Sequence, residues 1–234
     1  MPQNSNHKVA KDAETNGFSV GDAIGVGWER FTQYPGILIG SLLLMQAISF
    51  GVTLLPELFG DQPVLEIAFN LIAFFVQIGI MIGFIQLLIS AHDNSNPHFT
   101  QLFSGFDKRL LYFFTAALLI GVAVMLGLVL LIIPGVYFLL GLFFWQYPIV
   151  EDSSGPVEAM KYSWQITKGS RLNLLGFLAV SFFINMVGLV LLGVGLLVSA
   201  PTTALATVYI YRQLQKQDEK SPKRKPESNQ PATN

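Results

Sequence analysis

Residues 110–150 read LLYFFTAALLIGVAVMLGLVLLIIPGVYFLLGLFFWQYPIV, a tract of 41 residues without one charged side chain. At about 1.5 Å of rise per residue, a single helix of this length would reach roughly 60 Å, twice the thickness of a bilayer core. Pro134 and Gly135 interrupt the tract, and a Pro-Gly pair is a strong turn signal. The tract therefore predicts two membrane spans, residues 110–133 and 136–150.

The rest of the chain divides in the same way. Residues 36–55 and 64–91 are each long and apolar enough for one span, and residues 172–212 break at Gly193 and Gly195 into two more. We therefore expect an all-α membrane protein with six transmembrane helices within residues 18–212. The spans are predicted at residues 36–55, 64–91, 110–133, 136–150, 172–192 and 196–212. Residues 1–17 and 213–234 are polar and are expected to be disordered.

The basic residues fix an orientation for these spans. Charged residues make up only 12% of the chain, about half of the usual fraction in soluble proteins, and hydrophobic residues make up 52%. Six spans place all 14 Lys and Arg residues on one side, which is the distribution typical of cytoplasmic loops. One long span over residues 110–150 would instead export Lys161, Lys168 and Arg171. The pattern predicts a multi-pass protein of the bacterial cytoplasmic (inner) membrane with both termini in the cytoplasm.

An internal repeat is the second feature of the sequence. The stretch DAIGVGW at residues 22–28 aligns with EAMKYSW at residues 158–164, so that Asp22 and Trp28 correspond to Glu158 and Trp164. Each copy is a short amphipathic segment that leads into a span, and residues 98–106 form a weaker third copy. We expect three hairpins of two spans, each preceded by a short amphipathic helix on the cytoplasmic side. These helices either brace the bundle or form a docking surface for lipid or a partner protein.

Reactive side chains are scarce. The chain has no cysteine, and no ionisable residue lies well inside a predicted span. Glu151 and Asp152 are interpreted as solvated loop residues, and His92, Asp93 and His98 share one loop without a further metal ligand nearby. We therefore predict no catalytic, cofactor-binding or metal-binding residues. The candidate buried polar side chains are Gln77, Gln86, Gln146 and Asn185.

These amides have two possible roles. Gln77 and Gln86 lie nine residues apart and so about 180° apart around their helix, which gives no single polar stripe. Hydrogen bonds between helices are the simpler interpretation, and a path for a neutral solute is the alternative.

Several motifs together resemble a known family. They are FSVGDA at residues 18–23, IPGV at 133–136, EAM at 158–160, TKG at 167–169 and GVG at 193–195. In this arrangement the chain is similar, over residues 18–214, to a family of bacterial multi-span proteins of unknown function. That family is related to the membrane domain attached to some glycerophosphodiester phosphodiesterases. The resemblance implies the fold but no activity, and the sequence contains no phosphodiesterase catalytic domain.

Two functions remain open at this point. The first is a membrane protein without enzymatic activity that acts as a structural, accessory or lipid-interacting component. The alternative is a transporter or channel for a neutral or lipidic solute, although its helix breaks would be expected at the bilayer midplane rather than at the outer connections. We expect membrane lipids as partners, with a protein partner possible through the amphipathic helices, and no cofactor or nucleic acid. The oligomeric state is left open.

Overall fold

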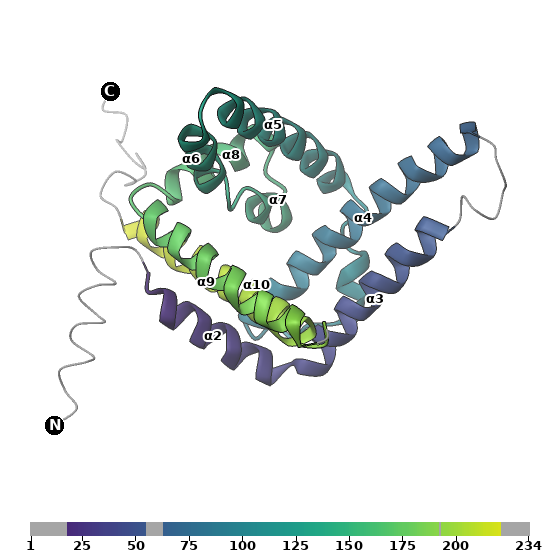
Figure 1. The fold of residues 1–234 in the computed structure, drawn as a ribbon. Coiled ribbons are helices and arrows are strands. Elements are labelled where there is room, and N and C mark those ends of the chain that lie inside the picture. The colour runs from purple at the N-terminus through teal and green to yellow at the C-terminus, as the bar shows by residue number, and fades with distance from the viewer. Residues whose placement is uncertain (1–17, 55–62, 192, 221–234) are drawn as a thin grey trace, which may run out of the picture.

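A computed structural model describes residues 18–54, 63–191 and 193–220, and throughout these ranges the chain is helix and turn without a strand (Figure 1). This confirms the all-α prediction for the described residues. The segments 1–17 and 221–234, predicted to be disordered, lie outside them. The helices are α2 (Val20–Gln33), α3 (Pro35–Leu54), α4 (Pro63–His92), η2 (Phe99–Phe103), α5 (Lys108–Leu130), α6 (Ile132–Gly141), α7 (Gln146–Asp152), α8 (Pro156–Ile166), α9 (Arg171–Val190) and α10 (Leu196–Lys220).

Five helical segments are long and apolar enough to cross a membrane, and they mark a membrane protein. Their outward faces remain apolar: Val64, Val129, Ile133 and Val190 are each exposed by 77–82%. A water-soluble protein would not leave so much apolar surface uncovered. The five segments are Pro35–Leu54, Pro63–His92, Lys108–Val129, Ile133–Asp152 and Arg171–Val190.

Helix α10 contains the sixth predicted span and differs from the other five. It is less apolar, yet its inward face, with Leu205, Val208 and Ile210, is fully buried. The hydroxyls of Thr202 and Thr203 donate to carbonyls of the preceding turn, which lets polar residues enter the interior. Burial within the protein, rather than contact with lipid, therefore stabilises this helix.

The helix also continues beyond its predicted end at residue 212. The prediction of disorder was wrong for residues 213–220, which are helical. Leu214 is buried, and Gln165 of α8 donates to the Asp218 carboxylate at 2.7 Å. Tertiary contacts from distant parts of the chain thus extend a segment whose local composition is polar.

The turn between α5 and α6 lies before the Pro-Gly pair rather than on it. Leu131 is extended (φ −164°, ψ 143°) and breaks the helix, while Pro134 falls in the first turn of α6. Proline is tolerated there because a first-turn amide has no partner within the helix. Gly127 and Gly135 instead let the two helices cross closely, since a Cβ on either would collide with the other helix.

The predicted span over residues 136–150 is not one continuous helix. Helix α6 ends at Gly141, and the separate short helix α7 buries Tyr147 through Val150 inside the protein. The hydroxyl of Ser163 accepts from the Phe144 amide and donates to the Gly141 carbonyl, both at 3.0 Å. Backbone groups freed by the break are satisfied by α8, so the chain can bend inward at low cost.

The three short helices α2, η2 and α8, here called the brace helices, each pack on the helix pair of a different predicted unit. Helix η2 packs on α4, which belongs to the helix pair before it in the chain. Helix α8 packs on α5 and α7. Helix α2, the first described helix, packs lengthwise along α10, the last described one, in the opposite direction (Figure 1). The contacts form a closed ring in which each helix pair is held by a brace helix from another unit.

Glycines make these brace contacts close. A Cβ on Gly27 of α2 would collide with the Thr202 carbonyl and with Ala206 of α10. On α4, Gly83 lies against the Leu102 backbone of η2, and Gly141 at the end of α6 lies against the Trp164 ring of α8. Small residues of this kind allow helices in membrane proteins to approach and gain van der Waals contact.

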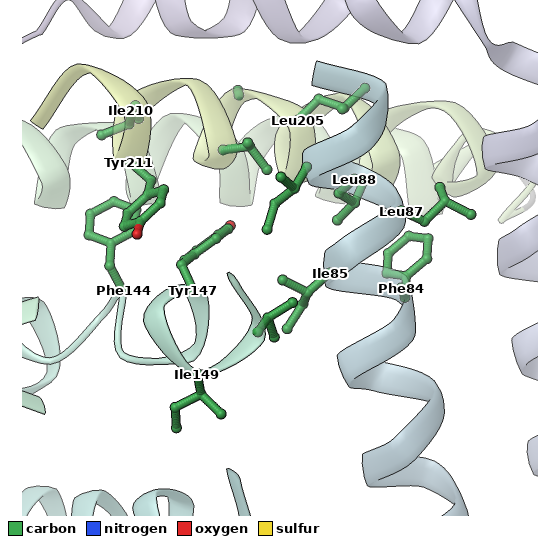
Figure 2. Close-up of a cluster of buried hydrophobic side chains, with 14 of the residues drawn as sticks. Phe84, Ile85, Leu87, Leu88, Phe144, Tyr147, Ile149, Leu205, Ile210 and Tyr211 are labelled. Atoms are coloured by element: carbon green, nitrogen blue, oxygen red, sulfur yellow. The ribbon is translucent and has the colours of Figure 1, made fainter. Parts of the chain in front are cut away.

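The shared core forms where the helix pairs meet. The C-terminal half of α4 contributes Ile85 and Leu88, α7 contributes Tyr147, and α10 contributes Leu205 and Tyr211 (Figure 2). The rings of Tyr147 and Tyr211 stack with centroids 4.6 Å apart. The turn ends of the helix pairs, here called the tips, carry the strongly exposed residues Val64, Val129, Ile133 and Val190.

The contact between α2 and α10 gives a first prediction. Replacing Gly27 by Ala should lower the free energy of unfolding by about 1–3 kcal/mol, because the new methyl group overlaps a backbone carbonyl that cannot move aside. The matched control is Gly25→Ala on the same helix, where no atom lies within 4 Å of the new Cβ. That change should stabilise the helix by up to about 1 kcal/mol. Thermal unfolding in detergent measures both, and equal effects would contradict the close packing.

Candidate functional site

An ionic cluster lies where α4, α7 and α10 meet. The Arg212 guanidinium of α10 contacts the Asp93 carboxylate at 2.6 Å and also pairs with Glu151 of α7. Asp93 directly follows α4, so one arginine joins three helices. Its side chain is only 19% exposed, which makes both carboxylates necessary as compensation for the charge.

Asp93 has a second partner within the cluster. Nδ1 of His92 lies 2.8 Å from the Asp93 carboxylate. Burial by itself raises the pKa of Asp93, but hydrogen bonds from Arg212 and His92 outweigh it and hold this pKa below its ordinary value. Asp93 therefore keeps its negative charge at neutral pH, and the ion pair with Arg212 persists.

A second arginine, Arg109 of α5, lies in the same region. Nη1 of Arg109 donates to the Gln86 side chain at 2.9 Å and to the Val150 carbonyl at 3.0 Å, while Nε pairs with Asp107 at 3.0 Å. Hydrogen bonds from Arg109 outweigh the effect of partial burial and lower the pKa of Asp107. Arg109 thus ties α5 to α4 and α7.

The two arginines contact adjacent residues of α7, Val150 and Glu151, so their clusters are continuous. We call this set the polar junction: Gln86, Asp93, Arg109, Glu151 and Arg212. Within it Arg212 pairs with Asp93 and Glu151, and Arg109 pairs with Asp107 at the start of α5. Chemically, the junction fixes the helix pairs relative to one another.

The structure changes the interpretation of the acidic residues at the end of α7. Glu151 was expected to be a solvated loop residue, and this was wrong: its side chain is 18% exposed and pairs with Arg212. The partner lies 61 positions away, so local sequence gave no signal for it. Arg109 and Arg212 were likewise taken only as markers of orientation.

The four candidate amides have separate environments. Gln86 accepts from Ser104 and Arg109 in the polar junction, whereas Gln77, half a turn away around α4, lines an apolar cleft. Asn185 of α9 donates to Thr203 at 3.1 Å and accepts from Ser199 at 3.0 Å, which joins α9 to α10. Gln146 begins α7. The structure does not bring the four together.

The histidines of the same region do not assemble a metal site in the described part of the chain. No group of three His, Cys, Asp or Glu side chains there could hold an ion. Asp93, the one carboxylate next to His92, is bound to Arg212. His98 instead starts η2, where its amide donates to the Gln101 side chain at 3.1 Å.

The repeat residues divide into two kinds. Asp22 and Glu158 lie in the first turns of α2 and α8, where Glu158 accepts from the Gly155 amide at 3.3 Å, as expected for helix starts. The tryptophans lie on cleft walls. Trp28 lines an apolar cleft of about 500 Å³ between α2, α9 and α10, and Trp164 lines one of about 320 Å³ between α5, α6 and α8.

A further cleft of about 300 Å³ lies between α3, α4 and α5. It is lined by Met45, Phe74 and Phe113 and by the side chain of Gln77. All three clefts have predominantly apolar walls. Clefts of this size and lining suit hydrocarbon chains or other apolar ligands.

Comparison with known proteins gives one match. Residues 104–216 match a domain of unknown function, DUF7847. The DUF7847 match begins just before α5 and ends within α10, so it contains Arg109, Glu151 and Arg212 but neither α2 nor α4. Comparison with curated proteins and with solved structures returned no match. An uncharacterised family is therefore supported, and the predicted relation to the phosphodiesterase membrane domain stays a prediction.

The polar junction gives a second prediction. Replacing Arg212 by Gln should lower the free energy of unfolding by at least about 2 kcal/mol, because Asp93 and Glu151 would remain half-buried and uncompensated. Lys216→Gln on the next turn of the same helix is the control, since Lys216 is exposed, and should change stability by less than about 0.5 kcal/mol. Thermal unfolding in detergent compares the two. Equal stability of both variants would show that the ion pairs contribute nothing.

Proposed function

We propose that this protein is a lipid-interacting component of the bacterial cytoplasmic membrane without enzymatic activity, and that it accommodates acyl chains in the clefts between its brace helices and its helix pairs. The observation that carries the proposal is the pairing of each repeat tryptophan with an apolar cleft between a brace helix and a helix pair. The two clefts differ in sequence but share this construction. Their common occupant must be apolar and flexible, as acyl chains are.

The interior of the protein favours lipid binding over transport of a solute along a path through the helix bundle. The central space is filled by α7 and by the stacked rings of Tyr147 and Tyr211 (Figure 2). The amides that could line a solute path face different surroundings, Gln77 in a cleft and Gln86 in the polar junction. Binding from the lipid side needs no such path.

We further propose six spans with both termini in the cytoplasm and a threefold repeat of one brace helix and one helix pair. The helix bounds support the repeat, because α3 and α9 are both 20 residues long and begin at the offset of the aligned motifs. The basic residues support the orientation, since Lys108 and Arg171 are the first residues of α5 and α9 and Arg212 lies in the C-terminal half of α10. The tips of the helix pairs then face the outer leaflet.

This orientation gives a third prediction, which the natural lack of cysteine makes simple to test. In intact cells, a membrane-impermeant thiol reagent should label Val194→Cys, at the exposed turn between α9 and α10. It should label Lys168→Cys, in the exposed segment between α8 and α9, only after permeabilisation. The reverse pattern, or equal labelling of both sites, would exclude the orientation.

The fourth prediction concerns the lipid itself. Native mass spectrometry of the full chain in mild detergent should show retained phospholipid. Replacing Val187, which lines the cleft beside Trp28, by Trp should reduce the number of retained lipids by filling its mouth. Val190→Trp is the matched control, because Val190 is more exposed, lies on the same helix and does not line that cleft.

Three results would count against the proposal. The first is protein that retains no lipid at any cleft. The second is solute flux in proteoliposomes that depends on Gln77 or Asn185, which would favour a transporter. The third is enzymatic turnover abolished by a single substitution.

A further inference from the structure

The cleft beside Trp164 combines an apolar interior with positive charge at its edge. Ala123 of α5 and Phe138 of α6 form the apolar wall, and Met160, Lys161 and Trp164 of α8 form the other side. Lys161 thus places an ammonium group at a cleft whose remaining lining is apolar. An exposed lysine can hold its charge at the edge while its methylene stem follows the wall.

A second cation lies behind the tryptophan. The Arg171 guanidinium carbon is 4.0 Å from the ring centroids of both Trp164 and Tyr137, so the cation is held between two aromatic faces. Its Nε is buried and has no hydrogen-bond partner among the described residues. The aromatic rings therefore position Arg171 while part of its hydrogen-bonding capacity is unused.

Neither cation has an anionic partner in the described parts of the chain. The ion pairs there involve His92, Arg109 and Arg212 but not Lys161 or Arg171. This contrasts with the polar junction, where each arginine has at least one carboxylate. The positive charges of Lys161 and Arg171, next to an apolar slot, fit a ligand with one negative group and one hydrocarbon chain.

Resting on the proposed lipid-binding function, we propose that this cleft binds an anionic phospholipid. One acyl chain fills the slot between α5, α6 and α8, and the phosphate lies at Lys161, while Arg171 adds positive charge from behind the Trp164 ring. Anionic lipid headgroups attract Lys and Arg side chains that lie near them. An acidic peptide would satisfy the charges but not the slot, and the exterior around the slot is apolar.

The experiment uses the full chain in nanodiscs that contain either phosphatidylcholine alone or phosphatidylcholine with phosphatidylglycerol, released into mild detergent for native mass spectrometry. We expect retained phosphatidylglycerol to exceed retained phosphatidylcholine. Lys161→Gln should lower phosphatidylglycerol retention about fivefold, as expected for the loss of one cation near a headgroup. Lys168→Gln, an exposed lysine outside the cleft, should not.

A steric variant tests the slot independently of charge. Ala123→Phe should reduce retention of both lipids by one bound molecule, whereas Ala117→Phe, on the exposed face of the same helix, should leave it unchanged. Equal retention of the two lipids, or a preference that Lys161→Gln does not alter, would overturn the anionic site while leaving the proposed function intact. Retention of neither lipid by the unmodified protein would overturn both.

Discussion

Charge compensation at the polar junction is the constraint on which this structure depends. An arginine withdrawn from water needs a counter-charge, and Arg212 finds two, on α7 and immediately after α4. Arg109 adds a bond to the α7 backbone next to that point. Because apolar helices gain little from one another in lipid, such polar contacts carry much of the specificity of their association. The polar junction consequently fixes the helix pairs relative to one another.

The brace helices supply the second layer of order. Their close approach depends on glycines at Gly27, Gly83 and Gly141, where a side chain would displace the neighbouring helix. The polar junction fixes where the pairs meet, and the braces fix how far apart their flanks lie. Trp28 and Trp164 each line an apolar cleft along those flanks. In the remaining unit, Phe106 instead lies directly against Gly79.

Much of the helical architecture could be predicted from hydrophobic length, and the reason is local. Spans at residues 36–55, 64–91 and 172–192 agree closely with α3, α4 and α9, since each is a continuous apolar tract between turn signals. Helix α7 could not be predicted, because its separation from α6 depends on Ser163, a residue of another helix. The same holds for the extension of α10 to Lys220, which is stabilised by burial of Leu214 and by contact with α8.

The candidate site residues likewise divide into those that local sequence predicts and those that depend on distant parts of the chain. Gln86 and the repeat tryptophans were recognisable because their residue types stand out from apolar or repeated surroundings. The ion pairs of the polar junction were not recognisable, since Asp93 and Arg212 are 119 positions apart in the chain. Distance along the chain, rather than weak chemistry, concealed the polar junction.

The ring of brace contacts also has a consequence for biosynthesis. Among the described helices α2 is synthesised first and its partner α10 last. Until then the face of α2 that carries Ala23, Gly27 and Phe31 has no protein surface to cover it, so insertion must proceed with this helix held by lipid or by the insertion machinery. Closure of the ring is thereby delayed until α10 has been synthesised, and a chain without α10 would leave this face of α2 uncovered.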